Sequence, residues 1–127
     1  MKRVYICSPL GGDVAAHIQQ VKRYTLYALK CGMAPVVPHF YALVLNDDIP
    51  EERELGRQAG MNLLWLCDEI WVFGEVISEG MEAEIRFSKN LNLPVRYITD
   101  RAVTGKYEST RREIGVYRDS KTAKETD

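Results

Sequence analysis

The 127-residue sequence lacks several features that would place it in a specialised class of protein. Its longest apolar stretches are too short to span a bilayer, which requires about 20 residues. The apolar run after Lys2 and Arg3 ends at Cys7, which is a strand's length and too short for a signal peptide. The 17 Lys and Arg residues are balanced by 18 Asp and Glu, so the basic excess of a nucleic-acid-binding surface is missing. We therefore expect neither a membrane nor a nucleic acid among its partners.

Cysteine and histidine are scarce as well. The three cysteines, Cys7, Cys31 and Cys67, are odd in number and show no C-x-x-C spacing, which argues against a disulfide framework and a zinc knuckle. The two histidines, His17 and His39, are too far apart in the sequence to suggest a metal site. We expect no metal, no cofactor and a cytoplasmic location.

The composition that remains, 46% hydrophobic and 28% charged residues, is that of one small globular domain. Strand-like apolar segments alternate with amphipathic helix-like segments. We predict strands over residues 3–8, 34–38, 69–73 and 94–98, separated by helices over 13–32, 51–66 and 78–92. This alternation predicts an α/β fold in which a parallel sheet of four to five strands is covered by helices on both faces.

The end of the chain does not continue this pattern. We predict a domain over residues 1–103 and a polar tail over 104–127 that is partly disordered or forms an interface. Trp65 lies off the main apolar stripe of the second helix and is a candidate oligomer contact.

A ligand site is expected at one edge of the sheet, because open parallel sheets bind ligands beyond the carboxyl ends of their strands. Residues 8–13, 38–41 and 74–84 should meet there. Two of these segments contain glycines and open a helix, whose free N–H groups favour an anion such as phosphate. Gly11 and Gly12 are equally consistent with an ordinary turn.

The helix predicted over residues 78–92 carries a carboxylate in an unusual place. At about 100° per residue, Glu84 projects between Met81 and Ser88 toward the sheet, whereas Glu79 and Glu82 lie on the opposite side. A carboxylate on an apolar helix face is unfavourable unless it is paired or functional. The alternative is a side chain at the edge of the apolar stripe that reaches water.

Asn62 falls in a similar position on the second helix, among the apolar residues Leu55, Ala59 and Leu66. It is either functional or a core amide bonded to the backbone.

Other polar side chains near the expected site have plain structural interpretations. From the pattern alone, Tyr5 is a packing residue with a satisfied hydroxyl, and His39 is a loop residue without a role as a ligand. Cys7 and Cys67 occupy buried positions and are interpreted as small hydrophobic residues.

Three motifs carry a resemblance to a known family: V-Y-I-C at 4–7 with Gly11 and Gly12, C-D-E-I-W-V-F-G at 67–74, and S-E-G-M-E-A-E-I at 78–85. With them, residues 2–98 resemble the nucleoside 2-deoxyribosyltransferase-like superfamily, in particular its small bacterial and phage members. That superfamily includes deoxyribosyltransferases and N-glycosidases that hydrolyse nucleoside 5′-monophosphates. The resemblance implies a three-layer flavodoxin-like or Rossmann-like fold.

The resemblance also implies a reaction, the cleavage or transfer of an N-glycosidic bond by a glutamate nucleophile. Glu84 stands at the position of that nucleophile, and Tyr5 matches the tyrosine that orients it. Ser78 stands where the monophosphate hydrolases have serine and the transferases have aspartate, which favours a nucleoside 5′-monophosphate over a nucleoside. The further substrate contacts expected in such a site are Ser8, Gly11, Gly12, His39, Asn62, Gly80 and Met81.

Two departures from the family pattern keep a second function open. Leu10 occupies the place of an arginine before the glycines, and the second helix has no clear equivalent of a carboxylate that handles the base, although Gly60 and Asn62 lie near its place. A nucleotide-binding or sensing module without catalysis is the alternative, and a partner-binding structural domain is a third possibility. The resemblance further implies a homodimer or higher oligomer whose neighbouring subunits complete the site.

Overall fold

A computed structural model describes residues 1–106 of the chain. The strands are β1 (Arg3–Cys7), β2 (Ala34–Val36), β3 (Glu69–Phe73) and β4 (Val95–Ile98), and the α-helices are α1 (Val14–Lys30), α2 (Pro50–Asn62) and α3 (Glu79–Asn90). Two 3-10 helices, η1 (Pro38–Leu43) and η2 (Leu63–Leu66), precede and follow α2.

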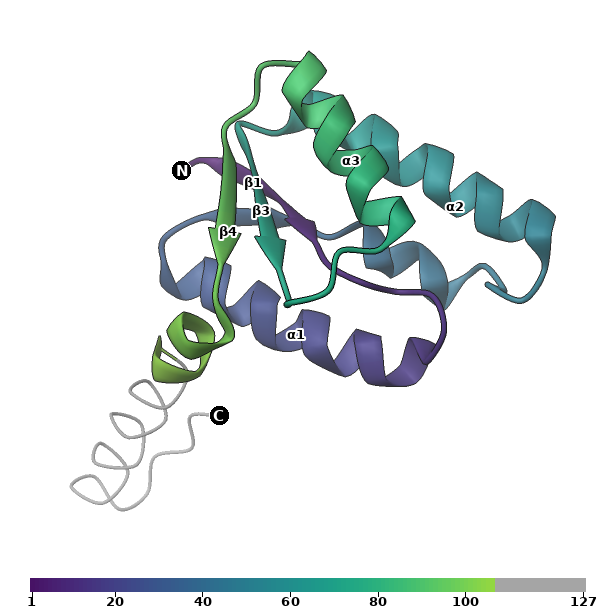
Figure 1. The fold of residues 1–127 in the computed structure, drawn as a ribbon, viewed down its shortest axis with the longest axis horizontal. Coiled ribbons are helices and arrows are strands. Elements are labelled where there is room, and N and C mark those ends of the chain that lie inside the picture. Colours follow the sequence, from purple (N-terminus) through teal and green to yellow (C-terminus); the bar gives the residue numbers. More distant parts are fainter. Residues whose placement is uncertain (107–127) are drawn as a thin grey trace.

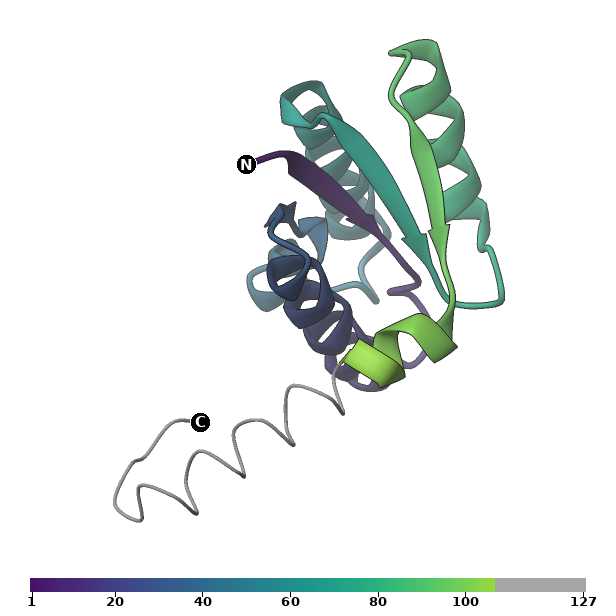
Figure 2. The same cartoon turned by 90° about the vertical axis from the view of Figure 1, so that its left-hand side faces the viewer.

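The four strands form one sheet in the order β2-β1-β3-β4, and every pairing between them is parallel. α1 covers one face of the sheet, whereas α2 and α3 lie on the other (Figures 1 and 2). The predicted α/β fold with a parallel sheet between helical layers is therefore confirmed, with four strands in the part of the chain that the structure describes.

The two faces of β1 belong to different halves of the core, because side chains alternate along a strand. Val4 and Ile6 pack in the cluster that contains Tyr24 of α1. Tyr5 and Cys7 pack in the cluster that contains Met81 of α3. The strand thus presents both Tyr5 and Cys7 to the face of the sheet that α3 covers.

The first predicted helix is confirmed with Asp13 as its N-cap, but Cys31 and not Gly32 is its C-cap. The Asp13 side chain accepts a hydrogen bond from the backbone N–H of Ala16 at 3.1 Å, which caps the amino end of α1. Gly32 follows the carboxyl end of the helix with φ +82°, a conformation that glycine adopts without steric cost.

The helix predicted over residues 51–66 differs from the structure in two ways: the position where the α-helix ends, and the face that packs against the fold. α2 ends at Asn62, and the chain continues as the 3-10 helix η2. Leu55 and Leu66, which the pattern assigned to the apolar face, are 58% and 54% exposed. The helix packs instead through Gly56 and Gly60, where an added Cβ would stand 3.2 Å and 3.1 Å from neighbouring side chains.

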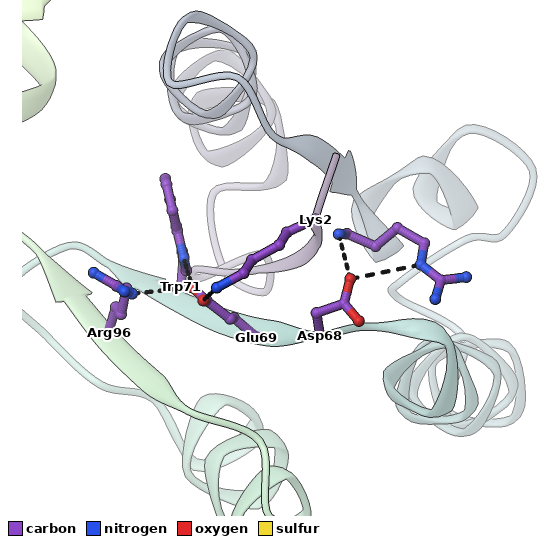
Figure 3. Close-up of polar contacts among 6 residues, drawn as sticks. Lys2, Asp68, Glu69, Trp71 and Arg96 are labelled. Carbon is purple, nitrogen blue, oxygen red and sulfur yellow. Dashed lines mark hydrogen bonds and ion pairs between the residues drawn. The ribbon is translucent and has the colours of Figure 1, made fainter.

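The amino ends of β1, β3 and β4 are joined by a buried carboxylate, that of Glu69 (Figure 3). It accepts hydrogen bonds from Lys2 at 2.8 Å, from the indole N–H of Trp71 at 2.9 Å and from Arg96 at 3.0 Å. The hydrogen bond from Lys2 is the main cause that lowers the pKa of Glu69. A buried carboxylate requires such partners, so this cluster holds the strands in register at the edge away from the expected site.

The last described residues, 100–106, are helical and pack onto the fold. The Thr99 hydroxyl accepts a hydrogen bond from the Ala102 N–H at 3.1 Å, and Val103 is buried at 1% exposure. The expected boundary between domain and tail at 103/104 falls inside this helical segment. The rest of the expected tail lies outside the described residues.

Candidate functional site

A pocket lies at the carboxyl ends of β1 and β3. The chain leaves β1 toward α1 on one face of the sheet and leaves β3 toward α3 on the other (Figure 1), so this is the point where open α/β sheets bind ligands. The pocket has a volume of about 660 Å³, a size suited to a small organic ligand. Its lining includes Ser8, Leu10, Gly11, His39, Asp47, Glu52, Arg53, Arg57, Gly60, Ser78, Glu79, Gly80, Met81 and Glu84.

Both carboxylate oxygens of Glu84 are held by β1. The Tyr5 hydroxyl donates a hydrogen bond to Oε2 at 2.6 Å, and the Cys7 thiol donates one to Oε1 at 3.3 Å. Both donors are fully buried, while Glu84 remains partly exposed in the wall of the pocket. The direction of Glu84 expected from the helix phase, toward the sheet, is confirmed.

Burial decides the electrostatics of this group. It raises the pKa of Glu84 above the ordinary value of 4.5, whereas the hydrogen bonds from Tyr5 and Cys7 lower it. Burial and the charge of Glu84 raise the pKa values of Tyr5 and Cys7, so both keep their protons at neutral pH. None of the ion pairs within residues 1–106 involves Glu84. The carboxylate is thus desolvated and oriented by two neutral donors.

His39 lies beside the pocket and is 4% exposed. Its Nε2 is 3.0 Å from the carbonyl oxygen and 3.1 Å from the hydroxyl of Ser8. Because a carbonyl only accepts, we assign the ring proton to Nε2, which leaves a lone pair on Nδ1. Nδ1 is buried without a hydrogen-bond partner in the described part of the chain. Burial lowers the pKa of His39, so the ring is neutral at pH 7 and Nδ1 is an unused acceptor.

The amino end of α3 forms another wall of the pocket. Ser78 caps the helix, and its hydroxyl oxygen accepts a hydrogen bond from the Met81 N–H at 3.2 Å. The hydroxyl proton remains able to donate to a ligand. Gly80 lies beside it, where an added Cβ would be 3.9 Å from the Ser78 oxygen.

The two glycines after β1 have different positions. Gly11 lines the pocket, whereas Gly12 is outside the lining and has φ +81°, which makes it a turn glycine. A Cβ added at Gly11 would be 3.8 Å from a carboxylate oxygen of Asp47. Leu10 adds no charge to this wall, and its carbonyl lies 3.0 Å from Nδ1 of His17.

Asn62, like Gly12, is not brought to the pocket. It is exposed at the end of α2, and its amide donates to the carbonyl of Gln58 at 2.9 Å. Gly60 lines the pocket in its place, and a Cβ there would be 3.5 Å from the Tyr5 hydroxyl oxygen. α2 therefore places a residue without a side chain, Gly60, next to the Tyr5 hydroxyl.

Sequence reasoning missed two residues of the site. Cys7 was interpreted as a small hydrophobic residue, although its spacing of two from Tyr5 places both on one face of the strand. Arg53 was not singled out; it is exposed, lines the pocket and has no ion pair within the described residues. Arg57, one turn further along α2, is bound by Glu54 at 2.6 Å and 3.0 Å.

Neither a cluster of side chains that could bind a metal ion nor a helix that could cross a membrane is present in the described part of the chain. Within residues 1–106, no three side chains of His, Cys, Asp or Glu are placed together to hold a metal ion. None of the helices in this part has the length and hydropathy needed to cross a bilayer.

The parallel sheet, its two helical layers and the pocket at its switch point define a three-layer α/β protein of flavodoxin-like architecture. The chain belongs to the family described as a domain of unknown function, DUF7768, whose model matches residues 2–98. No curated protein gives a significant match to the chain.

Solved structures extend the comparison of the fold. The chain is similar to the 2-deoxyribosyltransferase from the psychrotolerant bacterium Bacillus psychrosaccharolyticus, a biocatalyst for the synthesis of nucleosides. The two have a TM-score of 0.61 and 17% sequence identity, and the match covers 76% of this chain and 72% of that one. At this identity the likeness shows a shared fold, which confirms the fold that the sequence resemblance implied.

Proposed function

We propose that the protein cleaves or transfers the N-glycosidic bond of a nucleoside or nucleotide, with Glu84 as the nucleophile. A nucleoside 5′-monophosphate is the favoured substrate. The observation that carries the proposal is the Glu84 carboxylate held by Tyr5 and Cys7 in the wall of a ligand-sized pocket. The shared fold with a 2-deoxyribosyltransferase supports it.

The reaction would proceed in two steps through a covalent intermediate. A carboxylate oxygen of Glu84 attacks C1′ of the sugar, the C1′–N bond breaks, and the base leaves with the bonding electrons and takes a proton from water. Water then attacks C1′ of the glycosyl ester, frees Glu84 and gives the sugar, or the sugar 5-phosphate from a monophosphate; alternatively a second base attacks C1′ and gives a new nucleoside or nucleotide. Burial favours the attack because it leaves the carboxylate poorly solvated, while the Tyr5 hydroxyl holds one of its two oxygens.

The walls of the pocket suit the other parts of such a substrate. The Ser78 hydroxyl, the amino end of α3 and the backbone of Gly11 would bind a 5′-phosphate. Arg53 would supply the cation that Leu10 does not. Nδ1 of His39 would accept a hydrogen bond from an N–H or O–H group of the base or sugar.

One observation favours the alternative, a nucleotide-binding module without catalysis. Gly60 stands in the pocket near the Tyr5 hydroxyl, in the region of α2 where the resembled transferases use a carboxylate on the base. Without that group, departure of the base depends on water or on the substrate itself.

We also propose that the chain forms a homodimer or higher oligomer. Trp65 on η2 is 65% exposed, and it contacts Phe87 of α3 with ring centroids 5.9 Å apart. An exposed tryptophan held in place by a second ring is suited to an interface between copies.

The proposal is tested by incubating the full chain with a panel of nucleosides and nucleoside 5′-monophosphates and measuring released base by chromatography. We expect release of base by the native protein and none by Glu84→Gln. Glu82→Gln is the matched control, because it makes the same change on the exposed face of α3 and should release base at the native rate.

Two outcomes would contradict the proposal. Unchanged release by Glu84→Gln would exclude Glu84 as the nucleophile. Binding of a nucleotide by the native protein, measured by calorimetry, with no release of base would favour the non-catalytic module.

A further inference from the structure

We propose that Cys7 is a second positioning residue for Glu84, which acts together with Tyr5 to fix the plane of the carboxylate. The inference rests on the proposed function and deepens it. Neither the family pattern nor the sequence motifs assigned a role to this thiol.

Two side chains of β1 contact the carboxylate of Glu84. Tyr5 and Cys7 are two residues apart on β1, so both point to the face that α3 covers. Tyr5 holds Oε2 at 2.6 Å, and Cys7 holds Oε1 at 3.3 Å. The other acceptor near the thiol, the Met81 carbonyl, is farther away at 4.0 Å. A hydrogen bond to one oxygen leaves the carboxylate free to rotate, whereas bonds to both oxygens fix its plane.

A thiol is well suited to this task. Tyr5 already donates one strong hydrogen bond at 2.6 Å, and a second strong donor would withdraw further charge from the carboxylate, whereas an S–H group is a weak donor that restrains direction at a smaller loss of charge. The raised pKa of Cys7 keeps the proton on sulfur. Cys7 thus limits rotation of Glu84 and leaves its reactivity largely intact.

The surroundings of Glu84 offer no other residue for this role. Only Tyr5 and Cys7 contact the carboxylate among the described hydrogen bonds. The other titratable or charged side chains that line the pocket are His39, Tyr41, Asp47, Glu52, Arg53, Arg57 and Glu79. These are identical in all the variants below, so a change between variants reports on the thiol.

The first test measures the pKa of Glu84 by carbon NMR of protein labelled at the glutamate carboxyl carbon, with its signal assigned from its loss in Glu84→Gln. Cys7→Ala should raise the pKa of Glu84, because a hydrogen bond to the ionised form is lost. Cys67→Ala is the matched control, since Cys67 is a buried thiol of the same cluster that donates to the Leu63 carbonyl at 3.4 Å. It should leave the pKa of Glu84 unchanged.

The second test is kinetic. Cys7→Ala should lower kcat about tenfold with KM nearly unchanged and move the acidic limb of the pH profile upward, as expected for a misaligned nucleophile. Cys7→Ser keeps a donor and should recover part of the rate, because its hydroxyl restrains the carboxylate again but withdraws more charge from it than the thiol does. An unchanged pKa of Glu84 in Cys7→Ala, or an equal shift in Cys67→Ala, would overturn the proposal.

The NMR test needs no catalysis, so its failure is separate from a failure of the proposed function. If Cys7→Ala does not fold, infrared spectroscopy of the S–H stretch can test the hydrogen bond between Cys7 and Glu84. The measurement uses the Cys31→Ala/Cys67→Ala protein, in which Cys7 is the remaining thiol. The band should move when Glu84 titrates and stay fixed in the same protein carrying Glu84→Gln. An S–H band whose position stays constant while Glu84 titrates would contradict the role of Cys7.

Discussion

Glu84 combines two properties that oppose each other in a folded protein. It is a carboxylate on the sheet-facing side of a helix, and its partners are neutral hydroxyl and thiol groups. Burial therefore disfavours its ionised form, as the raised pKa indicates. A group that destabilises the fold at neutral pH is typical of functional sites.

Replacing Glu84 should therefore stabilise the protein at neutral pH. Because its folded pKa is raised, Glu84 favours folding below its unfolded pKa, and that contribution is lost as pH rises through the folded pKa. Glu84→Gln, which can accept from Tyr5, should raise the free energy of unfolding by about 1 kcal/mol at about pH 8. Denaturant unfolding at about pH 4 should show no such gain.

The control for this comparison is Glu82→Gln, which alters an exposed carboxylate of the same helix and should leave the stability unchanged at both pH values. A Glu84→Gln protein that is less stable than native at high pH would show that Glu84 has a structural role.

Single residues differed in how well the sequence predicted them. The helix phase predicted the direction of Glu84, since Met81 and Ser88 on either side are apolar or small. The thiol of Cys7 was missed, because sulfur counts as hydrophobic in any pattern although it donates here. Asn62 was expected at the site because the predicted helix continued to residue 66 and placed it on the apolar face. In the structure α2 ends at Asn62.

α2 is the element whose role the sequence predicted least well. Helix phase is read from large apolar side chains, but Leu55 of α2 is exposed, and only Met61 near the end of the helix packs against the core. The residues of α2 that face the pocket are Glu52, Arg53, Gly56, Arg57 and Gly60, and the glycines among them carry no apolar side chain that would indicate burial in the sequence. β3 and α3 were predicted almost to the residue, because their apolar residues carry the packing themselves.

The residues of α2 that face the pocket predict which substrates it prefers. Arg53→Gln should raise KM for a nucleoside 5′-monophosphate about tenfold and leave KM for the matching nucleoside unchanged, because a charge-assisted contact to the phosphate is lost. Arg57→Gln is the matched control, since Glu54 already binds the Arg57 side chain. Steady-state kinetics would measure the KM of each variant for the monophosphate and for the nucleoside. Equal losses on nucleoside and monophosphate would contradict a phosphate contact of Arg53.

At the scale of the whole molecule, the alternation of strands and helices was enough to predict a parallel sheet with two helical layers. The order β2-β1-β3-β4 was not predicted, because it depends on contacts between residues far apart in the sequence, such as Glu69 with Lys2 and Arg96. That order is what opens the pocket between β1 and β3.

The proposed self-association is also a property of the whole molecule. Multi-angle light scattering should give the mass of a dimer or larger assembly for the full chain, and Trp65→Lys should lower that mass. Tyr97→Lys, a change to another exposed aromatic side chain, is the comparison and should keep the native mass. A native protein with the mass of one chain would contradict the assembly.

The central claim is that Glu84 forms a covalent bond to the sugar. Its most direct test is mass spectrometry of protein quenched during reaction with a substrate whose sugar carries fluorine at C2′, which slows breakdown of the glycosyl ester. We predict one added glycosyl group on the peptide that contains Glu84, lost in Glu84→Gln and kept in Glu82→Gln. Release of base with no added group, or with the group on another residue, would contradict the account.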